Sequence, residues 1–441
     1  MINLIEDRTH VPQENIQIDQ KCQRLSTLIF DTFIPTLKFG EDRPYCKEDF
    51  LSSNRKRLDL FNQIHSSLLI DEHNFKEKNT RKNVVAPLLL LCGENVQSTE
   101  WTNPQLIQIS YTILTFLKNS ALKKESIRAV LICSDCEILN WCLEDLHNKL
   151  ETWKNYPGAQ HSLSWLLRQL TSPEISQFLP KFMPFVLRFL DDWEPRNKIT
   201  ALHCLDHILA NSTKANLSKF GYIQVVKSAL FHLLIGQRDF KTLQICYPCI
   251  FKLLEKTNNP KDNLDPSKYS DWDEFAKKLF YNIQTETQQE LKLFYGQQLK
   301  ELLPCLGIGT VRWMSTILEI ISDFTENSRC LRHEGLEILS IVLELCEDRV
   351  KFHVDIIYQT LIRCLYDLGG DDNNSTHSGS QIDQRFSSFS RAENLYTFFF
   401  FQFFRFSPCD AISEVIIGQK NCAANMFLIF EVFFFCIKML Q

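Results

Sequence analysis

Two pairs of cysteines have a spacing that is used in redox and metal chemistry. Cys133-Ser-Asp-Cys136 and Cys246-Tyr-Pro-Cys249 each match a redox dithiol or half of a zinc site. The pairs lie about 110 residues apart, outside the usual spacings of zinc ligands. The second pair lies in a stretch of helical periodicity, whereas a thioredoxin-like motif follows a strand. A thiol oxidoreductase using Cys246 and Cys249 therefore stays a remote alternative.

Two other groupings have a simpler structural explanation. His203 and His207 share one helical face, but no third metal ligand can be identified near them. Asp191 and Asp192 are adjacent, and adjacent carboxylates rarely point at one substrate. The sequence therefore predicts no catalytic residue, no metal site and no cofactor. We do not expect an enzyme.

The two aspartates lie between two predicted helices, within residues 179–209. Pro180 and Pro184 are expected in the first turn of the leading helix or in its approach, because proline has no N–H to donate. The apolar face of this helix is formed by Phe185, Val186, Phe189 and Leu190. The second helix is expected to begin near Pro195, and its apolar face is formed by Ile199, Leu202, Leu205 and Leu209.

The turn itself provides the candidate site. Asp191 and Asp192 are expected to fill the turn and cap the second helix, with Pro195 at its start. The neighbouring side chains, Trp193, Arg196 and Lys198, are the predicted partner contacts, since tryptophan and arginine often anchor interfaces. In an alternative interpretation, Trp193 packs into the next repeat.

Neither helix buries its apolar face alone, so neighbours must stack on both sides. Asp192 and Asp239 are 47 residues apart, at the upper end of the period of about 40–47 residues expected of stacked helix pairs. The chain has only 13 glycines in 441 residues and no clear alternating strands. The predicted fold is all-α, an α-solenoid of stacked antiparallel helix pairs of the HEAT/armadillo type.

Changes of composition suggest four regions. These are an amino-terminal helical region (1–155), a helical array (156–368), a flexible linker (369–394) and a Phe-rich atypical tail (395–441). The polar connection 256–271 is a candidate hinge within the array. We expect the tail to be a truncated or alternatively translated end. A membrane anchor is the alternative, although the terminal apolar run is short and contains Glu431.

The net charge, the length of the apolar runs and the number of cysteines limit the kinds of partner and the location that we expect. The net charge of −5 and the lack of a long basic block argue against nucleic acid as a partner. The first residues lack the features of a signal peptide, and no apolar run is long enough to predict a membrane span. Sixteen cysteines without such a signal are typical of reduced thiols. We therefore expect a cytoplasmic and nuclear protein that does not bind a membrane.

Residues 189–205, together with the prolines of the helix before them, resemble the second Tel-two-interacting protein family, whose members are subunits of the Triple T complex. The positions that carry the resemblance are Pro180, Pro184, Leu190, Asp191, Asp192, Lys198, Leu202 and Leu205. The segments around Arg312-Trp313 and 353–365 are also similar, whereas Ala201 stands where the family often has Gly. The similarity extends over about residues 160–368, and the Phe-rich end has no recognised counterpart.

The resemblance implies a non-enzymatic adaptor without a cofactor. Its partners would be the two other Triple T subunits, phosphatidylinositol-3-kinase-related kinases and, indirectly, the Hsp90 machinery. Its role would be the assembly and stability of those kinases, with effects on the DNA-damage response and growth signalling. Helical periodicity alone also fits a HEAT-type transport or trafficking receptor.

Overall fold

A computed structural model describes residues 13–37, 43–70, 75, 77–258, 268–346, 349, 351–353, 355–357, 359–361 and 363. Every regular element among these residues is helical, as the sequence predicts. The chain divides into two compact units, residues 1–258 and 259–441. The division falls within the polar connection 256–271. Predictions for the linker 369–394 and the tail 395–441 lie outside the described residues.

The first unit contains thirteen α-helices in its described part. They are α1 (Gln13–Thr32), α2 (Leu51–Ile70), α3 (Lys78–Thr80), α4 (Ala86–Asn95), α5 (Pro104–Phe116), α6 (Ile127–Leu131), α7 (Cys133–Glu151), α8 (Pro157–Gln169), α9 (Ile175–Leu190), α10 (Pro195–Asn211), α11 (Lys214–Lys219), α12 (Tyr222–Leu233) and α13 (Phe240–Thr257). Short π-helical turns at Arg81–Val85 and Leu117–Ala121 adjoin α4 and α5.

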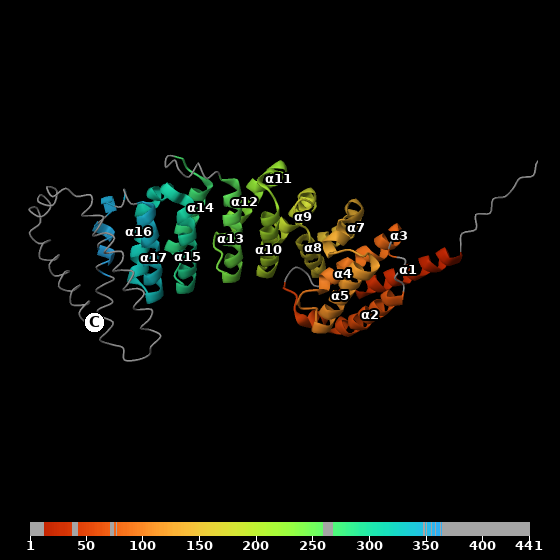
Figure 1. Cartoon of the computed structure of the whole chain (residues 1–441). Coiled ribbons are helices and arrows are strands. Elements are labelled where there is room, and N and C mark those ends of the chain that lie inside the picture. The colour runs from red at the N-terminus through yellow and green to blue at the C-terminus, as the bar shows by residue number, and fades with distance from the viewer. Residues whose placement is uncertain are drawn as a thin grey trace, which may run out of the picture. The chain divides into compact units, whose positions relative to one another are not determined.

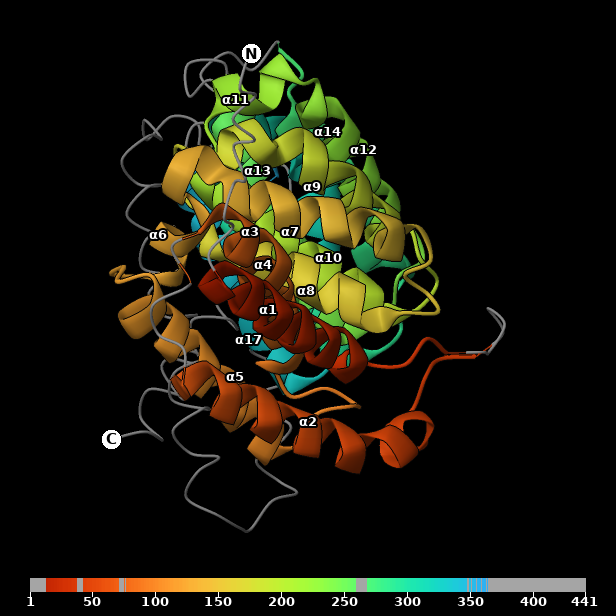
Figure 2. The same cartoon turned by 90° about the vertical axis from the view of Figure 1, so that its right-hand side faces the viewer.

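Stacked helix pairs form the carboxy-terminal half of this unit (Figure 1). Helix α9 packs against α10 and α12, while α10 packs against α8, α9 and α13. At the amino-terminal end, α1 packs on α2 and α4 (Figure 2). Helix α4 is buried along its whole length. It approaches α8 closely at Gly93, where an added Cβ would lie 2.6 Å from Cε3 of Trp165.

Helices α10 and α13 run parallel to each other, as three contacts along them show. Leu202 accepts a weak bond from Cys249, Asp206 pairs with Lys252, and the carbonyl of Ser212 accepts a hydrogen bond from Lys256. Residue numbers rise together on both helices, with an offset of 44–47. Their first residues therefore lie at the same edge of the unit, and the predicted 47-residue period is a real structural repeat.

The position predicted for the two prolines of α9 is wrong. Pro180 and Pro184 lie inside the helix, which already begins at Ile175. Both are exposed, on the same side as Lys181 and Arg188, so water can reach the carbonyls that lose their N–H partners. The opposite face, with Val186 and Phe189 fully buried, holds the helix in place despite the two missing bonds.

The second unit has four α-helices in its described part. They are α14 (Asp271–Thr285), α15 (Gln289–Leu306), α16 (Met314–Glu326) and α17 (Arg329–Leu345), with 3-10 turns at Gly307–Trp313 and Lys351–His353. Helix α15 packs against α14 and α17, and α16 packs against α17. Gly307 has a φ of 54°, which lets the chain turn sharply between α15 and the 3-10 segment.

Candidate functional site: the α9–α10 turn

The predicted turn lies between α9 and α10, and its backbone is set by the two helix ends. Asp191 is the C-cap residue of α9, and its N–H donates to the carbonyl of Leu187 at 3.1 Å. Glu194 is the N-cap of α10, with extended backbone angles, and Pro195 is the first helical residue. The predicted places of Asp191 and Pro195 at this turn are therefore the observed ones.

The capping role predicted for the two aspartate side chains is wrong. Neither carboxylate accepts a backbone N–H of α10 among the hydrogen bonds of the described residues. Asp192 instead accepts from the side-chain amide of Asn197 at 2.5 Å, and its other oxygen lies 3.7 Å from the ammonium of Lys154. The physical reason is that the side-chain amide of Asn197, in the first turn of α10, is the donor that reaches the Asp192 carboxylate in place of a backbone N–H.

The predicted partner contacts have different environments. Trp193 is 55% exposed, so it is not packed into the next repeat. Arg196 pairs with Glu100 at 2.9 Å and lies over the ring of Tyr45, with 5.7 Å from its guanidinium carbon to the ring centroid. Lys198 is half-buried, and no ion pair of the described residues involves it. A partner contact at these residues stays a prediction.

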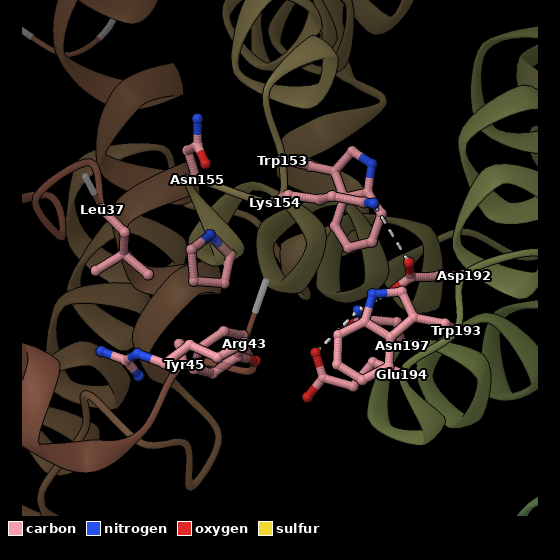
Figure 3. Close-up of a pocket in the computed structure, with 11 residues that line it drawn as sticks. Leu37, Arg43, Tyr45, Trp153, Lys154, Asn155, Asp192, Trp193, Glu194 and Asn197 are labelled. Carbon is pink, nitrogen blue, oxygen red and sulfur yellow. Dashed lines mark hydrogen bonds and ion pairs between the residues drawn. The ribbon is translucent and has the colours of Figure 1, made fainter. Parts of the chain in front are cut away.

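A small hollow opens beside Trp193 (Figure 3). It is lined by Trp193, Glu194, Asn197 and Asp192 from the α9–α10 turn, by Trp153, Lys154, Asn155 and Pro157 around the α7–α8 turn, and by Leu37, Arg43 and Tyr45. Its cavity volume is about 40 Å³. Pockets for small organic ligands measure several hundred Å³. The hollow therefore fits a water molecule or one side-chain head group rather than a substrate.

Glu194 is the least satisfied polar group of this site. It is 7% exposed, and its Oε1 has no hydrogen-bond donor among the described residues. Arg196 Nε lies 3.7 Å from this oxygen, too far for a hydrogen bond. Burial raises the pKa of Glu194, and the charges of Asp192 and Glu100 raise it further, while Arg196 opposes them. Glu194 Oε1 thus leaves the turn with one buried acceptor that has no donor among the described residues.

A buried ion pair that sequence reasoning missed lies deeper in the same unit. Arg57 on α2 pairs with Glu94 on α4 at 3.0 Å, and both side chains are almost wholly buried. Glu94 also accepts from the hydroxyl of Tyr156 at 2.5 Å and from the N–H of Ile34 at 3.0 Å. Arg57 donates further to Asn95 and to the carbonyls of Thr32 and Trp101.

The hydrogen bonds of Arg57 and Glu94 fix the position of the segment that leads to Leu37, which lines the hollow. It holds the backbone at Thr32 and Ile34, and Leu37 then donates its N–H to Asn155 at 2.8 Å. The signal in the sequence is Glu94 itself, which follows the apolar run Leu88–Cys92 directly after Gly93. An acidic residue in a helix that is otherwise apolar needs a buried partner, but sequence spacing does not say which basic residue supplies it.

A second satisfied carboxylate lies in the other unit. Asp273, in the first turn of α14, accepts from the backbone and hydroxyl of Ser270 at 2.8 and 2.9 Å. Its other partners are the indole N–H of Trp313 at 2.9 Å and Arg312 at 3.1 Å. The Arg312-Trp313 segment noted in the sequence therefore fixes the start of α14.

The remaining chemical candidates have structural roles. Cys246 and Cys249 are buried in α13, and burial raises the pKa of Cys249 to about 12 and raises that of Cys246 as well. Reactive thiols have lowered pKa values, so this environment argues against the oxidoreductase alternative. His203 is exposed, whereas His207 Nε2 lies 2.7 Å from the carbonyl of Leu170. No metal-binding group of three such side chains occurs among the described residues.

Each helix of the described ranges is too short or too polar to span a bilayer.

The fold defines the class of protein: an all-α protein of stacked helix pairs with an exposed turn and no assembled catalytic group in its described part. Residues 142–332 match the model of the Tti2 family. The chain is 27% identical over 305 residues to human TELO2-interacting protein 2 and 26% identical over 308 residues to the mouse protein. These matches cover 66% and 67% of this chain, and the chain spans 59% of the length of each relative.

Solved structures show only a distant likeness. Importin beta is 11% identical, with a TM-score of 0.47 over 89% of this chain and 51% of that chain. A likeness at this level has no bearing on function.

Proposed function

We propose that this protein is a non-enzymatic adaptor that holds a partner protein within a Triple T-like co-chaperone complex. The match of residues 142–332 to the Tti2 family carries the proposal. The relatives are named for their interaction with TELO2, so TELO2 and the third Triple T subunit are the partners to test. An exposed tryptophan on a turn between two helices and a hollow too small for a substrate support a role in protein binding.

We further propose a cellular role for the complex. Through Triple T and the Hsp90 machinery, the adaptor supports the assembly and stability of phosphatidylinositol-3-kinase-related kinases, and so the DNA-damage response and growth signalling. It acts in the cytoplasm and the nucleus. These statements depend on the family resemblance and are tested by measuring kinase levels and cell fractions after depletion of the protein.

Affinity purification of the tagged chain followed by mass spectrometry is the deciding experiment. We expect recovery of the two other Triple T subunits together with the kinases. If these proteins are absent and transport cargo with small GTPases is recovered instead, the adaptor proposal fails and the transport receptor replaces it.

A further inference from the structure

A second exposed turn lies beside the α9–α10 turn. The α12–α13 turn carries Ile235, which is 64% exposed, and leads into Phe240, which is 40% exposed. Helices α10 and α13 run parallel with an offset of 47 residues near their starts, so Phe240 lies level with Trp193. Packed helices are about 8–10 Å apart. One extended segment of a partner can therefore contact both turns. We call Trp193, Ile235 and Phe240 the apolar ridge.

The charges around the ridge are mostly positive. Arg238 and Lys241 are exposed, and Lys198 is half-buried. No ion pair among the described residues involves these three side chains. Asp191 is the exposed acid of the two turns, because Asp192 is buried and Asp239 caps α13 by accepting the N–H of Thr242 at 2.9 Å. The exposed charge beside the ridge is therefore predominantly basic.

Basic side chains also lie in the first turns of the two helices. Arg196 lies in that of α10 and Lys241 in that of α13, and neither first turn contains an acidic residue. The acidic groups at these helix starts are the N-cap residues, the buried Glu194 and Asp239, whose carboxylate already accepts the N–H of Thr242. An acidic group from outside would therefore be attracted by the exposed side chains of Arg238 and Lys241.

From the apolar ridge and its unpaired cations, we infer that this edge binds a partner segment that carries acidic residues next to apolar side chains. The segment belongs to a Triple T partner subunit, so the inference rests on the proposed function. Its apolar side chains pack on Trp193, Ile235 and Phe240, and its carboxylates face Lys198, Arg238 and Lys241.

The test uses the full chain co-expressed with the two other Triple T subunits and measures their recovery. Ile235→Ser should lower recovery about fivefold or more, since truncating a central apolar contact commonly has such an effect. Val225→Ser is the matched control, because Val225 is an exposed apolar residue near the opposite end of α12. This control should bind as the unchanged protein does.

Charge reversal tests the chemistry of the partner. The double change Arg238→Glu and Lys241→Glu should lower recovery about tenfold, although an acidic residue in the first turn of α13 favours the helix. Weaker binding by an equally stable variant therefore cannot be attributed to unfolding, and thermal unfolding checks this. Lys124→Glu, in the exposed connection between α5 and α6, is the charge control. Raising the salt concentration should weaken binding of the unchanged protein more than that of the double variant.

The outcomes separate the two proposals. If the unchanged chain recovers no Triple T subunit, the proposed function fails, and this inference fails with it. If it recovers them but Ile235→Ser and the charge reversal bind equally well, the proposed function stands and the inference is wrong. Stronger binding by the charge reversal would show a basic partner and also overturn the inference.

Discussion

Glu94 and Glu194 are two buried carboxylates of the same unit, and they differ in how many of their oxygens have a hydrogen-bond donor. Glu94 has an arginine, a tyrosine hydroxyl and a backbone N–H as partners, all from other elements. Glu194 has one oxygen without a donor and lies beside an exposed tryptophan. A carboxylate whose hydrogen-bond partners all come from the protein stabilises the fold. A carboxylate at the edge of a hollow, with one oxygen that lacks a protein donor, can accept a hydrogen bond from water or from another molecule.

The largest expected effect comes from breaking the satisfied site. Glu94→Gln keeps the side-chain shape but leaves Arg57 as a buried charge without its counter-ion. Such a loss costs about 3–5 kcal/mol, which corresponds to a fall in melting temperature of roughly 6–20 °C at about 2–4 °C per kcal/mol. Thermal unfolding followed by circular dichroism measures it. Glu100→Gln, which removes the partly exposed partner of Arg196, should cost less than about 1 kcal/mol. Equal melting temperatures for both variants would contradict this assignment.

Acid should destabilise the same region through a histidine. His161 packs edge-on against Trp101, and burial, with a contribution from Arg168, lowers its pKa from 6.5 to about 4. Above pH 6.5 the imidazole is neutral in both the folded and the unfolded state, and the free energy of unfolding is at its full value. As the pH falls from 6.5 toward 4, the unfolded chain takes up the proton first, so the free energy of unfolding decreases. The loss amounts to up to about 3 kcal/mol. His161→Gln should lose less stability than the unchanged protein between about pH 7 and pH 4.5, measured by denaturant unfolding. Parallel pH curves for the two proteins would refute the assignment.

A smaller effect is expected at the turn. Asp192→Ala leaves the amide of Asn197 and the ammonium of Lys154 without their common partner. The cost of such a loss is about 1–3 kcal/mol, or a few degrees in melting temperature. Partner recovery should fall only in proportion to the folded fraction. A variant that has a normal melting temperature but recovers no partner would show that Asp192 contributes to binding rather than to the fold.

The smallest effect on stability is expected for Trp193→Ala. The indole is more than half exposed, and such surface changes usually alter stability by no more than about 0.5 kcal/mol. Recovery of the Triple T subunits should nevertheless fall, because exposed tryptophans are frequent interface anchors. Melting temperature and recovery measured on one preparation decide the question. A marked loss of stability with unchanged recovery per folded molecule would show that Trp193 supports the fold.

The amino-acid sequence by itself determined the all-α class, the 47-residue repeat and the helix–turn–helix unit around Asp191. These features depend on apolar periodicity and turn residues, which act over a few residues of the chain. Pro195 at the start of α10 was predictable for the same reason, since its fixed φ suits a first helical turn.

Only the tertiary structure decided which groups meet. Arg57 and Glu94 are 37 residues apart, and nothing local selects one as the partner of the other. Asp192 binds the side chains of Asn197 and Lys154 rather than a backbone N–H of α10, and it is the α7–α8 turn that brings Lys154 beside it. Pro180 and Pro184 are tolerated inside α9 because packing buries the other face and leaves them to solvent. Local propensity determines where helices form, whereas desolvation and the stacking of helices determine which side chains contact each other.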